Sequence, residues 1–187
     1  MLAAVARPRG DGSFQAVVLL HGNHEFAKEY VHLAEALSRA GVIAIAACWF
    51  SGGGGSGSRF ITPLACPGAP AMPEAGSAVA RRTVDALVQA ARTLPGVGSN
   101  RVALFGHSRG GGAALNYILT NGTVQAAVLD SAGCPTEVRA RAQQIDGKEV
   151  EAKYYEGGGH SEIFTNATQR DDEVQRMAAF LRRHVRN

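Results

Sequence analysis

A serine between two glycines, in residues 106–110 (GHSRG), has the type and spacing of a catalytic nucleophile. A mainly apolar run at 101–105 precedes it, as a short buried strand would, and helix-forming residues follow it at 113–120. The flanking glycines let the backbone turn sharply, so Ser108 can occupy a strained position at the apex of a strand-to-helix turn. The sequence therefore predicts Ser108 as a nucleophile. The alternative is a glycine-rich turn in which Ser108 only caps the following helix.

A serine hydroxyl is a weak nucleophile at neutral pH and needs a base within hydrogen-bond reach. His160 follows an expected strand and the three glycines 157–159, which would let its ring approach Ser108, and it comes after the serine in the chain. We expect His160 to be the base; a solvated loop histidine is the alternative. His107 is expected to pack beside the nucleophile.

Two backbone amides are candidates for an oxyanion hole, which stabilises the negative oxygen that develops during acyl transfer. The N–H of Arg109 stands at the start of the helix after the nucleophile, and the N–H of Asn23 follows a strand that ends in His21 and Gly22. The alternative for Asn23 is an ordinary strand-to-helix turn.

The elements around these residues alternate between apolar strands and amphipathic helices. The strands are predicted at residues 15–20, 42–47, 101–105, 125–129 and 150–155. The helices are predicted at residues 27–40, 77–94, 109–120, 136–145 and 169–184. This alternation predicts one α/β domain over residues 1–187: a three-layer α/β/α sandwich with a doubly wound, mostly parallel sheet.

In such a sheet the site forms at the carboxyl ends of the strands. A Gly-, Ser- and Pro-rich loop at 51–76 is expected near this rim, where it would cover the site. His24, Trp49 and Phe50 are predicted to line a substrate pocket, because aromatic side chains on a rim bind apolar groups well. Core packing beneath the loop is the alternative for Trp49 and Phe50.

Three segments together, LLHG, GHSRGG and YYEGGGHSEIF, resemble the α/β-hydrolase superfamily. More narrowly, they are similar to its dienelactone-hydrolase-like and prolyl-oligopeptidase-like serine hydrolases. The resemblance extends over most of the chain from residue 15. It implies the doubly wound fold, a Ser–acid–His triad, and esterase or peptidase chemistry. Dienelactone hydrolases proper use cysteine, so Ser108 places this chain with the serine enzymes.

The chain departs from that family where the acid should be. The family's acid-bearing strand is missing between residues 131 and 149. Asp130, which ends a strand beside the nucleophile strand, is the preferred acid, and Glu137 is second. Asp146 follows a helix leading away from the rim and is rejected. The absence of an effective acid is the other alternative; it would cost up to about 10,000-fold in turnover.

Composition excludes several classes of protein. The 187 residues are 45% hydrophobic and 19% charged, with a net charge of +3. We find no apolar run of about 20 residues for a membrane span, and no basic stripe with aromatics for nucleic acid. The N-terminus has too short an apolar core for a secretory signal.

Cys48, Cys66 and Cys134 lack metal-ligand spacing, so no metal or other cofactor is expected. An odd number of cysteines favours a reducing, cytoplasmic location, with a disulfide involving Cys66 as the alternative.

We therefore expect a serine hydrolase that cleaves carboxylic esters of small soluble substrates through an acyl-enzyme on Ser108. A peptidase or amidase of the same fold is one alternative. A non-catalytic binding protein that lost its acid is the other. A sheet edge left open by the missing strand would allow a homodimer.

Overall fold

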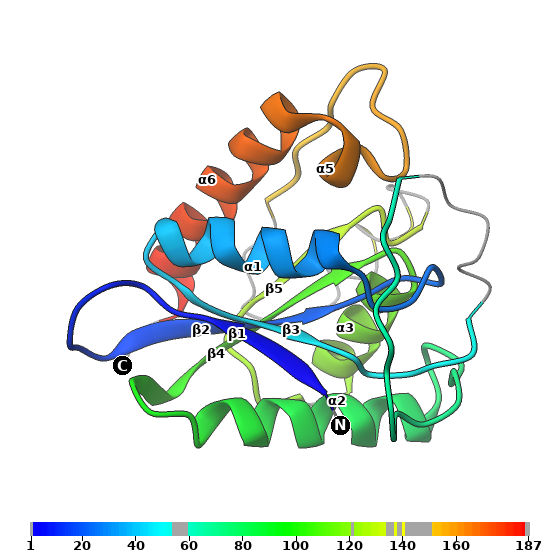
Figure 1. The fold of residues 1–187 in the computed structure, drawn as a ribbon, viewed down its shortest axis with the longest axis horizontal. Coiled ribbons are helices and arrows are strands. Elements are labelled where there is room, and N and C mark those ends of the chain that lie inside the picture. Colours follow the sequence, from blue (N-terminus) through cyan, green and yellow to red (C-terminus); the bar gives the residue numbers. More distant parts are fainter. Residues whose placement is uncertain are drawn as a thin grey trace.

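A five-stranded sheet with strand order β1-β3-β2-β4-β5 forms the centre of the protein (Figure 1). The computed structural model describes residues 2–53, 60–120, 122–133, 137, 140 and 151–185. The strands are β1 (Ala3–Ala6), β2 (Phe14–Leu20), β3 (Ile43–Ala47), β4 (Val97–His107) and β5 (Ala127–Asp130). Strands β2 to β5 are parallel, and β1, which the sequence did not predict, pairs antiparallel with β3.

Helices cover both faces of this sheet (Figure 1). On one face lie α1 (Lys28–Arg39), α6 (Ala167–His184) and the short α5 (Glu162–Thr165); on the other lie α2 (Ala78–Arg92) and α3 (Arg109–Leu119). The predicted three-layer α/β/α sandwich with a mostly parallel sheet is confirmed.

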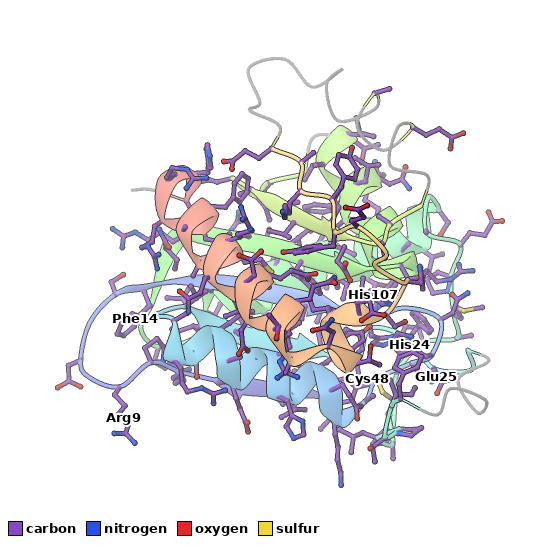
Figure 2. All side chains as sticks on the ribbon, turned by 90° about the horizontal axis from the view of Figure 1, so that it is seen from above. Arg9, Phe14, His24, Glu25, Cys48 and His107 are labelled. Atoms are coloured by element: carbon purple, nitrogen blue, oxygen red, sulfur yellow. A yellow bond between two sulfur atoms is a disulfide. The ribbon has the colours of Figure 1, made fainter. Side chains whose placement is uncertain are left out.

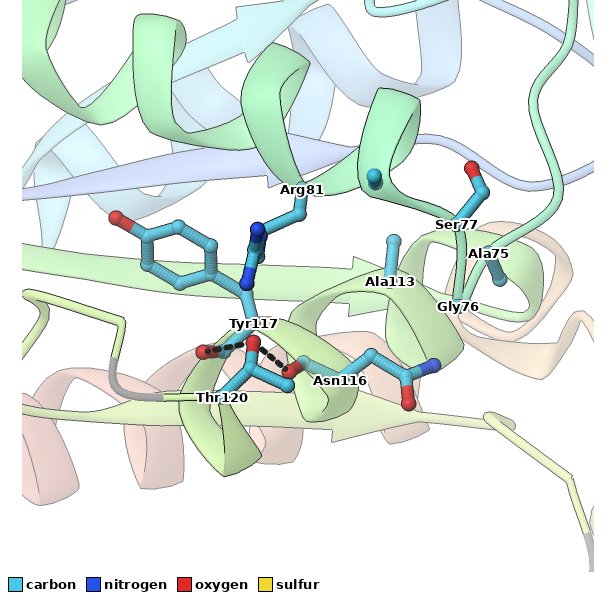
Figure 3. Close-up of a pocket in the computed structure, with 9 residues that line it drawn as sticks. Ala75, Gly76, Ser77, Arg81, Ala113, Asn116, Tyr117 and Thr120 are labelled. Atoms are coloured by element: carbon cyan, nitrogen blue, oxygen red, sulfur yellow. Dashed lines mark hydrogen bonds between the residues drawn. The ribbon is translucent and has the colours of Figure 1, made fainter.

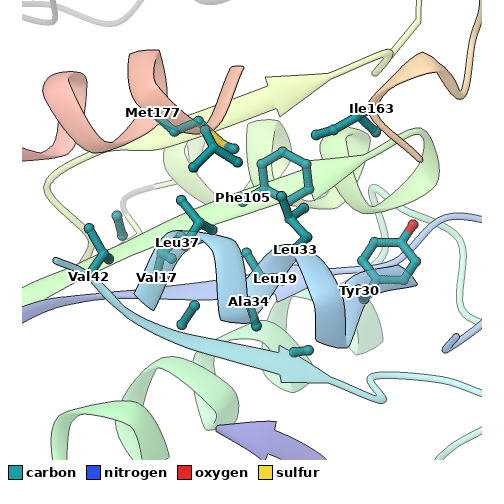
Figure 4. Packing of buried hydrophobic residues seen from close by; sticks show 14 of the residues in the cluster. Val17, Leu19, Tyr30, Leu33, Ala34, Leu37, Val42, Phe105, Ile163 and Met177 are labelled. Atoms are coloured by element: carbon teal, nitrogen blue, oxygen red, sulfur yellow. The ribbon is translucent and has the colours of Figure 1, made fainter. Parts of the chain in front are cut away.

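The apolar side chains of β2 are buried on both faces of the sheet, as expected of a central parallel strand. Val17 and Leu19 pack with Leu33 and Leu37 of α1 (Figure 4), whereas Val18 and Leu20 join the cluster beneath α2 and α3. Burial of this apolar surface fixes β2 in the middle of the sheet and therefore fixes where its carboxyl end emerges.

The register of the parallel strands brings their carboxyl ends to one rim. Leu20 of β2 lies beside Gly106 of β4, and His107 of β4 lies beside Asp130 of β5. Figure 2 shows His24 and His107 at this end of the molecule, away from Arg9 and Phe14 at the other end. The nucleophile segment and the preferred acid therefore meet at the same rim, as the sequence predicted.

The predicted strand at 150–155 is wrong over its described residues, 151–155, which form no strand. This stretch is mostly exposed, and its side chains bond to α6 rather than to a neighbouring strand. Glu151 pairs with Arg183, and the hydroxyl of Tyr155 donates to Asp172 at 2.6 Å. Polar contacts to a helix, together with the lack of an apolar face, explain why the alternating pattern does not produce a strand.

The predicted helix at 136–145 and the rejected Asp146 fall largely outside the described residues. Within the described chain, β5 pairs only with β4. The homodimer through this edge stays a prediction.

A disulfide joins Cys48, just after β3, to Cys66. It ties the loop after residue 60 to the rim, since Cys48 is fully buried there. Disulfides are more usual in oxidising compartments. The cytoplasmic location stays a prediction. Among the helices of the described chain, none has the length and apolar character to cross a membrane.

Candidate active site

Ser108 stands at the junction of β4 and α3 in the strained conformation that the sequence predicts. Its φ is 54° and its ψ is −117°, and its side chain is half-buried. A positive φ costs a non-glycine residue about 1–3 kcal/mol and persists only where the surroundings impose it. The neighbouring chain comes very close at this turn, because a Cβ on Gly110 would lie 2.1 Å from the carbonyl oxygen of Leu20. The elbow is thus pressed against the end of β2.

The turn after β2 lies directly against the nucleophile. A Cβ on Gly22 would be only 3.0 Å from the Cβ of Ser108. The guanidinium of Arg109 donates to the side-chain oxygen of Asn23 and, at 2.9 Å, to the carbonyl of Pro73. Within the described chain, we find no hydrogen-bond partner for the backbone N–H of Asn23 or Arg109. The two predicted oxyanion donors therefore belong to residues that are held together and flank Ser108.

The preferred acid, Asp130, is bonded to His107. Its Oδ2 lies 2.5 Å from Nδ1 of His107, and the hydroxyl of Ser131 donates to its Oδ1 at 3.3 Å. His107 is 0% exposed, whereas the Asp130 side chain is 16% exposed. The sequence predicted only a packing role for His107 and did not predict this bond. The parallel register that sets the two residues side by side is the signal that could have revealed it.

His160 lies exposed in the loop before α5, with its ring centroid 5.1 Å from that of His107. Partial burial and the nearby His107 lower the pKa of His160, while the charge of Asp130 raises it. Over the part of the chain that the structure describes, no hydrogen bond joins His160 to Ser108 or to Asp130. Catalytic hydrogen bonds are often long before substrate binds. The structure thus gathers Ser108, Asp130 and His160 around His107.

His24 is only 8% exposed and completes this group of rings. Its Nε2 lies 2.8 Å from the hydroxyl of Tyr30, and its ring centroid lies 5.2 Å from that of His107. Desolvation, followed by repulsion from His107 and His160, lowers the pKa of His24 to about 4. His24 is therefore neutral at pH 7. It forms a buried wall of the site.

Trp49 and Phe50 are fully buried, so the core-packing alternative describes them, and their predicted place in an open pocket is wrong. The indole N–H of Trp49 donates to the carbonyl of His21 at 2.9 Å. Both side chains support the turn before Asn23 from beneath.

Two other aromatic side chains lie partly exposed beside the site. Phe60 and Phe164 are half-buried, and their rings lie 5.7 and 5.8 Å from His24. Phe164 also lies 5.1 Å from His107. Neither was predicted from the sequence, because the loop and α5 that carry them have no helical or strand periodicity of their own.

A pocket of about 220 Å³ opens elsewhere, between the start of α2 and the outer side of α3 (Figure 3). Ser77, Arg81 and Asn116 line it, and neither Ser108 nor His160 does. It is separate from the candidate site. Among the described residues, no cluster of His, Cys, Asp and Glu has the arrangement of a metal site.

Solved structures with a similar fold include two hydrolases. A dienelactone hydrolase from Anabaena variabilis is 20% identical with a TM-score of 0.52, over 76% of this chain and 62% of its own. A structure named m3DLH is 19% identical with a TM-score of 0.53, over 93% of this chain and 71% of its own. A 2,6-dihydroxy-pseudo-oxynicotine hydrolase is 16% identical with a TM-score of 0.51, over 79% of this chain and 40% of its own. These similarities concern the fold alone. The chain spans less than two thirds of the length of the dienelactone hydrolase and of the pseudo-oxynicotine hydrolase.

The profile of the family described as serine aminopeptidase, S33, matches residues 12–177. The chain belongs to this family of hydrolases. No curated protein sequence matches it significantly. The predicted resemblance to the α/β-hydrolase superfamily is confirmed.

Proposed function

We propose that this hydrolase cleaves carboxylic esters of small soluble molecules through an acyl-enzyme on Ser108. The observation that supports this proposal most strongly is the strained conformation of Ser108 at the β4–α3 junction. Asn23 and Arg109 flank it, and their backbone N–H groups have no hydrogen-bond partner within the described chain. A serine that only capped α3 would not need a positive φ. The side chain of Ser108 also makes no capping hydrogen bond to α3.

In the proposed reaction, Oγ of Ser108 attacks the ester carbonyl while His160 accepts the hydroxyl proton. The N–H groups of Asn23 and Arg109 stabilise the oxyanion of the tetrahedral intermediate. The intermediate collapses to the acyl-enzyme, and His160 returns the proton to the departing alcohol. Water then attacks the acyl group, with His160 as base, and the carboxylic acid leaves. Asp130 supplies the negative charge that favours the imidazolium.

The surroundings of the site favour an apolar substituent on a small ester. Phe60 and Phe164 present half-buried rings beside His24 and His107. Apolar walls with a few polar groups are typical of small-molecule sites. Two structural neighbours, the dienelactone and pseudo-oxynicotine hydrolases, carry names that refer to small molecules.

Aminopeptidase or amidase activity is the second candidate, because the matching family is described as serine aminopeptidase. Rates on p-nitrophenyl esters and on aminoacyl anilides separate the two. We expect the ester to be the better substrate by kcat/KM, and a reversed preference would favour the peptidase.

The nucleophile is tested with Ser108→Ala. Turnover of p-nitrophenyl acetate should fall at least about 1,000-fold, as for other enzymes that lose a triad member. Ser38→Ala is the control, since Ser38 lies near the end of α1 and its hydroxyl donates to the carbonyl of Glu35, away from the site. Unchanged turnover in Ser108→Ala would favour the third alternative, a non-catalytic binding protein.

A further inference from the structure

One buried atom at the site has no partner: Nε2 of His107 forms no hydrogen bond within the described chain. We infer that His107 is a positioning residue that connects Asp130 to His160, so that the acid supports the base through a second imidazole. The inference rests on the proposed function, in which His160 is the base for Ser108.

The bond to Asp130 determines the tautomer of a neutral His107. A carboxylate only accepts hydrogen bonds, so Nδ1 of His107 must donate across the 2.5 Å contact. Nε2 then carries a lone pair and can only accept. An unsatisfied buried acceptor costs about 1–3 kcal/mol. A donor that completes this side of the ring is therefore expected.

Two imidazoles lie near enough to be that donor. His24 is 5.2 Å from His107 between ring centroids, but Nε2 of His24 is already bonded to Tyr30. His160 is 5.1 Å away and has no hydrogen bond within the described residues. Ring nitrogens lie about 1.1 Å from their centroid, so this separation suits an N–H···N bond of about 3 Å. His24 keeps only its Nδ1 for a further bond, whereas neither ring nitrogen of His160 has a hydrogen bond within the described residues, so we assign the bond to His160.

The resulting chain of groups performs the work of a triad acid. Nδ1–H of His160 donates to His107, which leaves Nε2 of His160 with the lone pair that accepts the Ser108 proton. When His160 becomes an imidazolium, the ionised Asp130 stabilises the charge through the intervening ring. No proton has to leave His107, and no bond beyond those of the ester reaction forms or breaks. The relay thus lets Asp130, the acid that the sequence analysis prefers, act on His160 without touching it.

The charged and titratable groups facing this relay come from several elements. Desolvation, followed by repulsion from His107 and His160, lowers the pKa of His24, which follows β2. Asp130, at the end of β5, raises the pKa of His160 against desolvation and repulsion from His107. Glu173 of α6 lies near enough to Asp130 for the two charges to repel, and desolvation followed by this repulsion raises the pKa of Glu173 to about 7.

Three variants of His107 separate the relay from its alternatives. His107→Asn keeps a donor near Nδ1 and removes the acceptor, His107→Gln keeps an acceptor near Nε2 and removes the donor, and His107→Phe keeps only the ring volume. We expect each to lower kcat about 100- to 10,000-fold, with the acidic limb of the kcat/KM profile moving to lower pH because His160 loses anionic support. Asp130→Asn should behave alike, and combining it with His107→Asn should cost no more than about threefold further.

Other outcomes would overturn the relay. Near wild-type turnover in His107→Phe would make His107 a packing residue. Activity in His107→Asn but not in His107→Phe would make it a clamp for an Asp130 that contacts His160 directly. Exposed His32 gives the matched control, His32→Phe.

If the His107 variants fail to fold, a measurement on the wild-type protein that does not depend on turnover still tests the relay. In the wild-type protein at pH 8, ¹⁵N–¹H spectra of the imidazoles should show His107 and His160 both protonated at Nδ1. Protonation of His160 at Nε2 instead would contradict the relay. If Ser108→Ala retains full turnover, the proposed function fails, whereas the spectra still decide whether the two imidazoles are bonded.

Discussion

The hydroxyl of Tyr30 accepts a hydrogen bond from the backbone N–H of Gly22 at 3.0 Å. Tyr30 belongs to α1 and is fully buried, whereas Gly22 lies in the turn that contacts Ser108 and carries the Asn23 amide. The same hydroxyl bonds to His24 at 2.8 Å. A buried core side chain therefore holds one half of the proposed oxyanion hole in place.

Tyr30→Phe removes this support. The Gly22 N–H would be buried without a partner, so we expect a loss of about 1–3 kcal/mol in the free energy of unfolding. Turnover should also fall, because the Asn23 amide is no longer held. Urea unfolding and kcat on p-nitrophenyl acetate measure the two effects.

Tyr117→Phe is the matched control, since Tyr117 bonds to Asp85 at 2.7 Å away from the site. It should lose stability while keeping kcat. Equal kinetic effects from both variants would show that Tyr30 has no particular role in positioning the turn.

The elbow should reject a side chain at Gly110. The Cβ of Gly110→Ala would lie 2.1 Å from the Leu20 carbonyl oxygen, a backbone atom that cannot move without disturbing β2. We expect a loss of more than about 3 kcal/mol, or failure to fold. Gly112→Ala, two residues further along α3, meets nothing nearer than 3.4 Å and should be neutral or stabilising by up to about 1 kcal/mol. Thermal melts compare them, and a tolerated Gly110→Ala would contradict the tight elbow.

Buried histidines make the fold sensitive to acid. Desolvation lowers the pKa of both His21 and His24 from 6.5 to about 4. Between pH 6.5 and pH 4 the unfolded chain binds protons at these histidines that the folded chain excludes. The contribution of the two neutral histidines to the free energy of unfolding is therefore complete above pH 6.5 and is lost as pH falls to 4. It amounts to about 3 kcal/mol for each histidine.

Urea unfolding between pH 8 and pH 4 measures this loss. His24→Gln should flatten the dependence, and His32→Gln, at an exposed position on α1, should leave it unchanged. An identical slope in wild type and His24→Gln would contradict the assignment to His24.

Phe60 and Phe164 should set the preference for apolar acyl groups. Each buried methylene contributes about 0.8 kcal/mol, so truncating both rings should reduce the butyrate-over-acetate preference in kcat/KM about tenfold. Phe180→Ala is the control, because Phe180 packs against His184 at the far end of α6. An unchanged ratio in Phe60→Ala/Phe164→Ala would place the acyl group elsewhere.

The disulfide should contribute to stability through the loop it closes. Cys48 and Cys66 are 18 residues apart, a spacing for which a crosslink contributes about 3 kcal/mol. Reduction with dithiothreitol should lower the melting temperature, and Cys48→Ala/Cys66→Ala should show the same loss without responding to reductant. A reductant effect in the double variant would point to another cause.

Local sequence patterns predicted most of the fold because they report burial directly. The spacing of Tyr30, Leu33 and Leu37 gave the buried face of α1, and the apolar run of β2 gave a strand covered on both sides. The glycine spacing around Ser108 gave the elbow. These features depend on neighbours within a few residues.

Features that depend on register or on distant contacts were not predictable in this way. The bond between His107 and Asp130 exists because β4 and β5 pair in one alignment. Phe60 and Phe164 come together from a loop and from α5, which lie far apart in the sequence. Strand β1 has too few apolar atoms to stand out. Each of these features depends on contacts between segments that are distant in the sequence, and local periodicity does not report such contacts.

The nucleophilic character of Ser108 is the central claim, and a fluorophosphonate probe tests it most directly. Intact mass after incubation, followed by mapping of the labelled peptide, should show one equivalent bound to Ser108 and none in Ser108→Ala. A folded wild-type protein that takes up no label, or takes it up elsewhere, would contradict the account.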